Sequence, residues 1–139
     1  MIKVGGEGDI SNRKWMWSLP DKTISTDTCT PALYEGRIYL LNGEKRVFSM
    51  LDPEDGAIKW QVDLPGKARY FTSPTLADGK IYCMNQEGLA VVLSAVDGKL
   101  LHKASMAGDA IDHPIRSSIP VANGQLYIRT NDMLYCIGK

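Results

Sequence analysis

The sequence has no excess charge of one sign. Its 139 residues contain 16 Lys plus Arg and 16 Asp plus Glu, which gives a formal net charge of zero. A chain without a net positive field has little to attract phosphate backbones or anionic lipids. The basic residues are also scattered, with adjacent pairs only at Arg13-Lys14 and Lys45-Arg46. The composition therefore predicts no nucleic-acid partner.

Long apolar runs are absent as well. Runs such as residues 89–93 have the length of a strand, whereas a membrane-spanning helix needs about 20 apolar residues. No transmembrane segment is predicted. Residues 1–6 also lack the charged start, apolar stretch and cleavage site of a secretory signal. Two interpretations follow: a cytoplasmic chain, or a chain whose upstream part is missing.

Cysteine is scarce. Cys29, Cys83 and Cys136 cannot all pair within one chain, and no C-x-x-C spacing occurs. A zinc site is therefore not predicted. Cys83 and Cys136 lie within apolar alternation, which predicts small buried thiols. A disulfide stays open as an alternative if the compartment is oxidising.

A repeat is the strongest feature that the sequence does contain. Residues 30–39 match residues 73–82 at a shift of 43 positions, with a small residue, Pro, a turn Gly and an apolar-Tyr pair in the same order. A third copy runs over residues 119–127, and its turn glycine Gly124 follows Gly79 by 45 positions. Such regular spacing indicates an array of similar structural units.

Each repeat reads as a small antiparallel sheet. Asp55-Gly56 and Asp97-Gly98 are hairpin signals, because Asp-Gly supplies the positive φ angles that a tight turn needs. No sustained helical period is present, and 13 Gly with 7 Pro oppose a helical repeat. The strands predicted for the first repeat cover residues 29–34, 37–42, 47–51 and 57–63.

Units of four strands and about 40 to 45 residues are typical of β-propeller blades. Asp-Gly followed by Trp60, then a small-Pro pair, then Gly and an apolar-Tyr pair resembles the PQQ-like (quinoprotein alcohol dehydrogenase-like) repeat family over residues 15–137. Residues 125–138 are similar to the C-terminal end of such domains in bacterial exported proteins. The fold expected from this resemblance is all-β, a partial or half propeller of about three four-stranded blades.

The array of repeats is expected to be incomplete at both ends. Residues 1–13 are predicted to be a lead-in segment, and residues 14–139 to form the repeats. Within the repeats we expect an orphan strand at 14–20, blades at 29–63 and 72–104, and a partial three-stranded blade at 117–138. Propellers typically have four to eight blades. The chain is therefore either the C-terminal part of a longer propeller, or a homodimer that closes a six-bladed ring through its 15–19 strand.

Three polar segments are candidates for chemical sites. Asp109, Asp112 and His113 suit metal ligation, but loop chemistry between repeats explains them better. Residues 52–56 are too short for a calcium loop and contain a proline, which favours a hairpin turn. Residues 5–9 lack the flanking strand and helix of a phosphate-binding loop. No catalytic, cofactor-binding or metal-binding residue is predicted.

The tryptophans have structural interpretations. Trp15, Trp17 and Trp60 offer large rings for a partner surface or a planar cofactor. For Trp60 the resemblance favours packing between adjacent blades. The second repeat has His102 where the family has Trp. In the dehydrogenases of this family, the quinone lies against an adjacent-Cys disulfide and a Trp, beside calcium. This chain has no adjacent cysteines, so no cofactor is predicted.

The function expected from the resemblance is a non-enzymatic protein-interaction scaffold with a protein partner, in the C-terminal part of a larger exported bacterial protein. Its compartment would be periplasmic or extracellular. The alternative is a fragment of a PQQ-dependent dehydrogenase, or of a multidomain enzyme with catalytic residues elsewhere. A structural piece without function outside its parent chain is a third interpretation.

Overall fold

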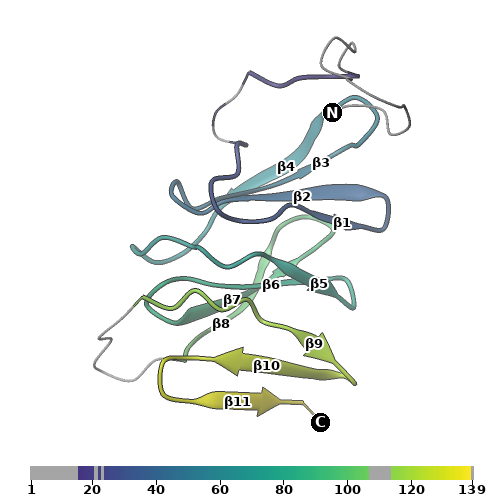
Figure 1. The fold of residues 1–139 in the computed structure, drawn as a ribbon. Helices are drawn as coiled ribbons and strands as arrows, with labels where there is room; N and C mark the ends of the chain where they lie inside the picture. The colour runs from purple at the N-terminus through teal and green to yellow at the C-terminus, as the bar shows by residue number, and fades with distance from the viewer. Residues whose placement is uncertain (1–15, 21, 23, 107–113, 139) are drawn as a thin grey trace, which may run out of the picture.

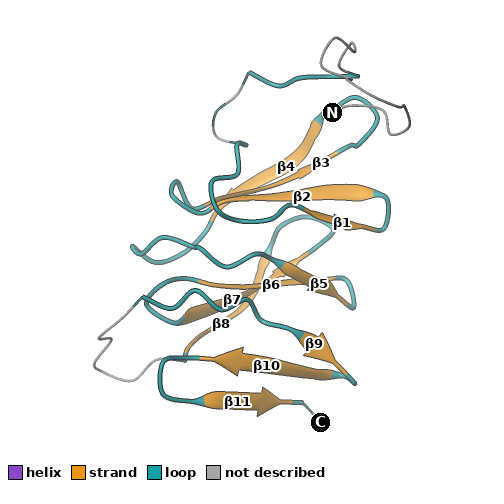
Figure 2. Cartoon of the chain, in the orientation of Figure 1, coloured by secondary structure: helices purple, strands orange, loops and turns teal. Residues whose placement is uncertain are grey.

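A computed structural model describes residues 16–20, 22, 24–106 and 114–138. Three antiparallel sheets stack along the chain in sequence order (Figures 1 and 2), and the described residues contain no helix. In particular, no helix long and apolar enough to cross a bilayer occurs in them. The predicted all-β class is confirmed. The predicted lead-in at 1–13 lies outside the described residues.

The first sheet contains four strands in sequence order. The tight connection between its first two strands is Glu35-Gly36, with φ angles of 48° and 69°, as a type I′ hairpin requires. Two of the strands coincide with the predicted ranges, whereas the first strand begins three residues later than predicted and the last begins one residue later. The strands are β1 (Ala32–Tyr34), β2 (Arg37–Asn42), β3 (Val47–Leu51) and β4 (Ile58–Asp63).

The second sheet repeats this design. Asp78-Gly79 makes the same turn, with φ angles of 50° and 65°. Pairing shifts at Met50/Leu51 in the first sheet and at Val92/Leu93 in the second, so even the irregularity follows the repeat. The strands of this sheet are β5 (Thr75–Ala77), β6 (Lys80–Met84), β7 (Leu89–Ser94) and β8 (Leu100–Ser105).

The third sheet has three strands in the order β11-β10-β9. Asn123-Gly124 forms its tight turn, with φ angles of 52° and 74°. Within the described residues, β11 pairs with β10 on one side, and its other side is an edge. The strands are β9 (Val121–Ala122), β10 (Gln125–Arg129) and β11 (Leu134–Ile137).

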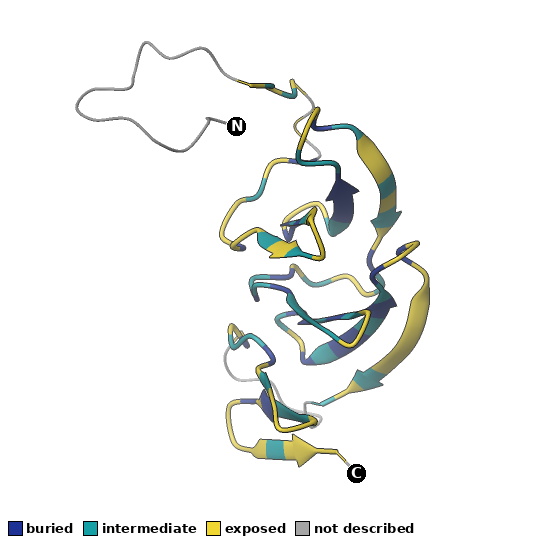
Figure 3. Ribbon diagram, turned by 90° about the vertical axis from the view of Figure 1, so that its right-hand side faces the viewer, coloured by how far each residue is buried: buried dark blue, intermediate teal, exposed yellow. Residues whose placement is uncertain are grey.

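The core lies between the sheets rather than within any one of them (Figure 3). One small sheet cannot bury both of its faces, so alternate side chains on each strand must pack on a neighbouring sheet. The larger cluster joins the first and second sheets through Tyr39, Leu41, Phe48, Met50, Ile81, Cys83, Val91 and Leu93. The smaller cluster joins the second and third sheets through Met84, Ala90, Ile115, Ile119 and Ile128.

The cysteine predictions have a mixed outcome. Cys83 is buried, as predicted, and so is Cys29. The prediction of a buried thiol at Cys136 is wrong, because this residue is exposed. Cys136 pairs with Tyr127, on the face of the third sheet opposite Leu126 and Ile128, which pack toward the second sheet. Alternation correctly indicated a strand at Cys136, but it does not reveal whether another sheet covers that face.

Candidate interaction surfaces

The contact of Trp60 with Gly98 joins the first two sheets. A Cβ atom on Gly98 would lie 2.8 Å from Cε3 of Trp60, so the hairpin of the second sheet lies directly on this ring. The other side of the joint is aromatic: Trp60 stacks on Phe48 at 5.9 Å and lies 6.1 Å from Tyr39, between ring centroids. Trp60 therefore packs between sheets, as the family resemblance implied.

Trp17 makes the same contact one unit earlier. A Cβ atom on Gly56 would lie 2.6 Å from Cε3 of Trp17, and Trp17 Nε1 donates a hydrogen bond to the Pro53 carbonyl at 2.9 Å. Residues 16–20, the described part of the predicted strand at 14–20, form no strand here. A strand needs a neighbour, and pairing of this segment with a last blade stays a prediction. Trp15 lies outside the described residues.

The hydrogen bonding of the two tryptophans differs for a local reason. Ala95 follows Pro53 by 42 positions in the repeat, and its carbonyl accepts a hydrogen bond from the Tyr39 hydroxyl at 3.0 Å. Trp60 Nε1 is buried without a hydrogen-bond partner. In the first sheet, the Pro53 carbonyl accepts from Trp17. The equivalent carbonyl of the second sheet, that of Ala95, accepts instead from Tyr39 of the first sheet, which adds a direct hydrogen bond between the two sheets.

Loops at one end of the strands are connected in a row by backbone hydrogen bonds. The Tyr70 N–H donates to the Gly43 carbonyl (3.0 Å), Gln86 to Arg69 (2.9 Å) and Ile115 to Gln86 (3.0 Å), all through backbone atoms. Gly43 must be glycine, since a Cβ atom there would lie 1.5 Å from the Tyr70 carbonyl oxygen. We call this surface the loop rim, made of residues 43–46, 65–74, 85–88 and 114–120.

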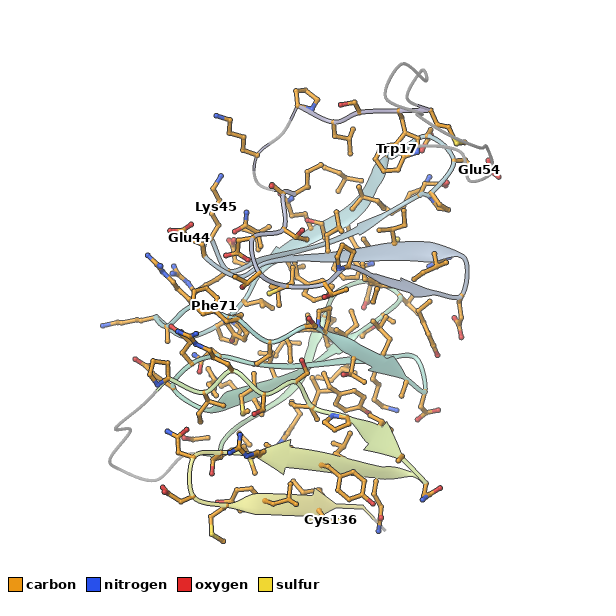
Figure 4. The ribbon with its side chains drawn as sticks, viewed as in Figure 1. Trp17, Glu44, Lys45, Glu54, Phe71 and Cys136 are labelled. Atoms are coloured by element: carbon orange, nitrogen blue, oxygen red, sulfur yellow. The ribbon has the colours of Figure 1, made fainter. Side chains whose placement is uncertain are left out.

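Charged side chains on the loop rim contact neighbouring loops; Arg69 and Arg116 are exposed, and Arg46 is half-buried. Arg69 Nη2 lies 3.3 Å from Glu44 Oε1, and the Arg116 guanidinium lies over the Phe71 ring, 5.9 Å from its centroid. Arg46 Nη1 donates to the Lys67 carbonyl at 3.4 Å. Figure 4 shows Glu44 and Phe71 at this end of the strands. The rim therefore presents Arg69 and Arg116 beside Glu44 and Phe71, and such arginines suit recognition of a partner's carboxylates.

A chain of hydroxyl contacts joins equivalent positions of the three repeats, and the sequence analysis missed it. The Thr30 N–H donates to Ser73 Oγ at 2.9 Å, and the Ser73 N–H donates to Ser118 Oγ at 3.0 Å. Matching the prolines pairs Ser73 with Ile119 and leaves Ser118 out of register. The 45-residue spacing between Gly79 and Gly124 gives the correct equivalence, because it also separates Ser73 from Ser118.

The end of the stack at β11 is apolar and open. Leu134 is 68% exposed, and Met133 and Ile137 are exposed as well. Beside this strand, a cavity of about 130 Å³ lies between the second and third sheets. It is lined by apolar side chains from both sheets and by His102, which stands where Trp60 stands in the first sheet. An exposed apolar strand edge is a surface suited to pairing with another strand.

The shifted side-chain pKa values have structural causes. Burial raises the pKa of Cys29 to about 11, with a further contribution from Asp27, and burial also raises the pKa of Cys83 and Tyr70. The pKa of Asp52 is lowered, because the Glu54 N–H donates to its carboxylate at 3.0 Å and Lys59 lies 3.1 Å away. The buried thiols therefore stay protonated at neutral pH.

The polar segments of the sequence analysis are turns where they are described. The Asp52 and Asp55 carboxylates accept bonds from the backbone of residues 54 and 57, which closes the hairpin between β3 and β4. The described residues hold no group of three or more side chains suited to a metal ion. Asp109, Asp112, His113 and residues 5–9 lie outside the described part of the chain.

Comparison with known proteins connects the repeat to a family. A family model described as outer membrane protein assembly factor BamB matches residues 10–138. No curated protein matches the chain by sequence.

Solved structures share the fold. Quinohemoprotein alcohol dehydrogenase ADHIIG from Pseudomonas putida HK5 has a TM-score of 0.64 and 21% identity, covering 81% of this chain and 18% of that one. BamB from Moraxella catarrhalis has a TM-score of 0.62 and 16% identity, covering 81% and 36%. The quinohemoprotein alcohol dehydrogenase from Comamonas testosteroni has a TM-score of 0.63 and 20% identity, covering 77% and 17%. The likeness shows the fold, a partial β-propeller, and the chain spans at most 36% of these proteins.

Proposed function

We propose, from the premise that the chain belongs to the family described as outer membrane protein assembly factor BamB, that its blades form a non-enzymatic scaffold for binding another protein. The scaffold would be the C-terminal part of a larger exported bacterial protein, in a periplasmic or extracellular setting. The similar BamB structure from Moraxella catarrhalis supports this assignment.

The loop rim is the observation that carries the proposal. Its loops are joined by backbone hydrogen bonds from Gly43 to Ile115, and two of its arginines are exposed beside Glu44 and Phe71. A surface that is already ordered loses less conformational entropy on binding. Arginine is also enriched at protein interfaces and at their energetic hot spots. The rim therefore fits a protein segment that carries carboxylates.

Capture from a bacterial envelope extract tests this function. The immobilised chain should retain a defined protein, and that protein, once purified, should bind the Arg69→Ala/Arg116→Ala variant about tenfold more weakly. Both arginines are exposed, so their loss should change folding stability little. The matched control is Arg37→Ala/Lys99→Ala, which removes two exposed charges away from the rim and should bind like the wild type. Equal binding by all three proteins, or no retained protein, would refute the proposal.

A second function has support from the similar dehydrogenase structures. In that case the chain would be a fragment of a quinone-dependent enzyme. Adding pyrroloquinoline quinone and calcium, then following absorbance and dye reduction, separates the two functions. We expect no bound quinone and no turnover, because the chain has no adjacent cysteine pair and covers 18% of the first of those enzymes. Quinone-dependent dye reduction would favour the enzyme.

A further inference from the structure

We propose that the cavity between the second and third sheets binds a small, planar aromatic molecule of about the size of an indole ring. The cavity has a volume of about 130 Å³ and is lined by side chains of both sheets, which are adjacent in Figure 1. An apolar cavity of about 150 Å³ can stay dry and bind benzene. The class of ligand follows from a comparison of two interfaces that the same repeat builds. We call the contact between the first and second sheets the first interface, and that between the second and third sheets the second interface.

Strand pairing shows which residues of the first two sheets occupy equivalent places. In the first sheet, Trp60 lies opposite Met50. In the second sheet, His102 lies opposite Val92. The same register continues two residues further along each strand. The positions equivalent to Phe48, Met50, Trp60 and Val62 are therefore, in that order, Ala90, Val92, His102 and Ala104.

These four side chains of the second sheet are all smaller than their equivalents in the first. Two large aromatic side chains are lost, because alanine stands in the place of Phe48 and histidine in the place of Trp60. All four line the cavity, together with Tyr82, which is the equivalent of Tyr39.

In the first interface this space is filled by an aromatic cluster. The Trp60 ring stacks on Phe48 with 5.9 Å between the ring centroids, and its centroid lies 6.1 Å from that of Tyr39. All three side chains belong to the core between the first two sheets or pack against it. A flat indole ring is therefore the group that this place accommodates where the repeat supplies one.

The third sheet restores only part of the missing volume. Ile128 stands where the second sheet has Cys83, which adds some volume, and Leu126 stands where it has Ile81, which adds none. The cavity remains between these side chains and the shortened ones of the second sheet. Protein interiors contain few voids larger than a water molecule. A void that four shortened side chains of one sheet open together therefore indicates a ligand site.

The lining favours a neutral aromatic ligand. Tyr82 and His102 carry the polar groups of the lining, and its other side chains are apolar. The Tyr82 ring can pack on a second ring in an offset or edge-to-face arrangement, and the His102 imidazole can hydrogen-bond a polar atom of the ligand. A charged ligand would lose its hydration against the aliphatic walls, which disfavours it.

Titration with indole, followed by NMR of the methionine methyl groups, tests the proposal. Met106 lines the cavity, whereas Met50 lies in the core of the first interface. A bound indole ring should shift the Met106 methyl signal saturably, with a Kd on the order of 0.1–1 mM, and leave the Met50 signal unchanged. No saturable shift of Met106, or an equal shift of Met50, would overturn the proposal.

Two variants that rebuild the first interface test whether the cavity is the site. His102→Trp restores the ring of Trp60 at the equivalent position, and Ala90→Phe restores that of Phe48. Either ring would occupy the cavity, so each variant should bind indole about tenfold more weakly or worse. Because His102 is exposed, its replacement should leave the fold intact even where Ala90→Phe strains the core. Wild-type affinity in both variants would overturn the proposal.

The matched control is Lys103→Trp, on the same strand as His102. Side chains alternate between the two faces of a strand, and Lys103 is exposed and does not line the cavity. This variant adds the same indole ring outside the cavity and should bind free indole like the wild type. A loss as large as that of His102→Trp would show that the added ring acts without filling the cavity, and would overturn the assignment of the site.

The cavity and the binding function of the loop rim can be tested separately. Neither Arg69 nor Arg116 lines the cavity, so Arg69→Ala/Arg116→Ala should bind indole like the wild type. His102→Trp should in turn still bind the partner of the loop rim. Failure of one proposal therefore leaves the other standing.

Discussion

The three thiols differ in reactivity for reasons that lie in their surroundings. Cys29 and Cys83 are buried, and burial raises the pKa of both, that of Cys29 to about 11. The thiolate is the reactive form. We expect a thiol reagent at neutral pH to label the exposed Cys136 rapidly. Cys29 and Cys83 should react only on unfolding.

Mass spectrometry of the labelled peptides measures this difference. Cys136→Ser should abolish the rapid phase, and all three thiols should react in denaturant. Labelling of Cys29 or Cys83 as fast as Cys136 would show that the core between the first two sheets is open.

At the residue scale, the sequence predicts the role of a side chain when that role depends on the pattern of its own repeat. Trp60 follows an Asp-Gly turn and packs between sheets as expected. Cys136 was predicted wrongly, because its exposure depends on whether another sheet follows. The Arg116 contact with Phe71 could not be predicted either, since it joins loops of different repeats that share no sequence pattern.

Among the hairpins, two glycines allow the contact between sheets to be measured. Gly98 and Gly79 have similar φ angles of 72° and 65°, so alanine at either position pays a similar backbone cost. A Cβ atom at Gly98 would lie 2.8 Å from Cε3 of Trp60, whereas a Cβ atom at Gly79 would have no atom within 4 Å. We expect Gly98→Ala to lower the free energy of unfolding by about 1–3 kcal/mol more than Gly79→Ala does.

Urea denaturation followed by tryptophan fluorescence gives both values. Subtracting the destabilisation by Gly79→Ala from that by Gly98→Ala removes the shared backbone strain. The difference in free energy of unfolding is then the cost of overpacking against the Trp60 ring. Equal destabilisation by the two variants would mean that the hairpin of the second sheet does not lie on Trp60 in solution.

Strands and turns were the most predictable elements. The predicted ranges 37–42 and 47–51 coincide with β2 and β3, because turn glycines and apolar alternation are local signals. Residues 16–20 could not be predicted in the same way. Their apolar sequence resembles a strand, but a strand forms only with a neighbour, and the described chain places none beside it.

At the scale of the whole molecule, the repeat predicted an all-β partial propeller, and family and fold comparisons confirm it. Partner choice is not visible in the repeat, because the repeat specifies contacts between neighbouring sheets of one chain. The surfaces suited to a partner lie where the repeat pattern stops, at the edge of β11 and at the loop rim.

Hydrogen–deuterium exchange with and without the captured envelope protein tests the central claim most directly, namely that the loop rim binds another protein. The account predicts that amides of the rim loops gain protection when that protein is bound, because the contact limits their local opening. Amides of β6 and β7, paired on both sides already, should stay unchanged, and Arg69→Ala/Arg116→Ala should reduce the gain. Protection that appears only away from the loop rim, or nowhere, would contradict the account.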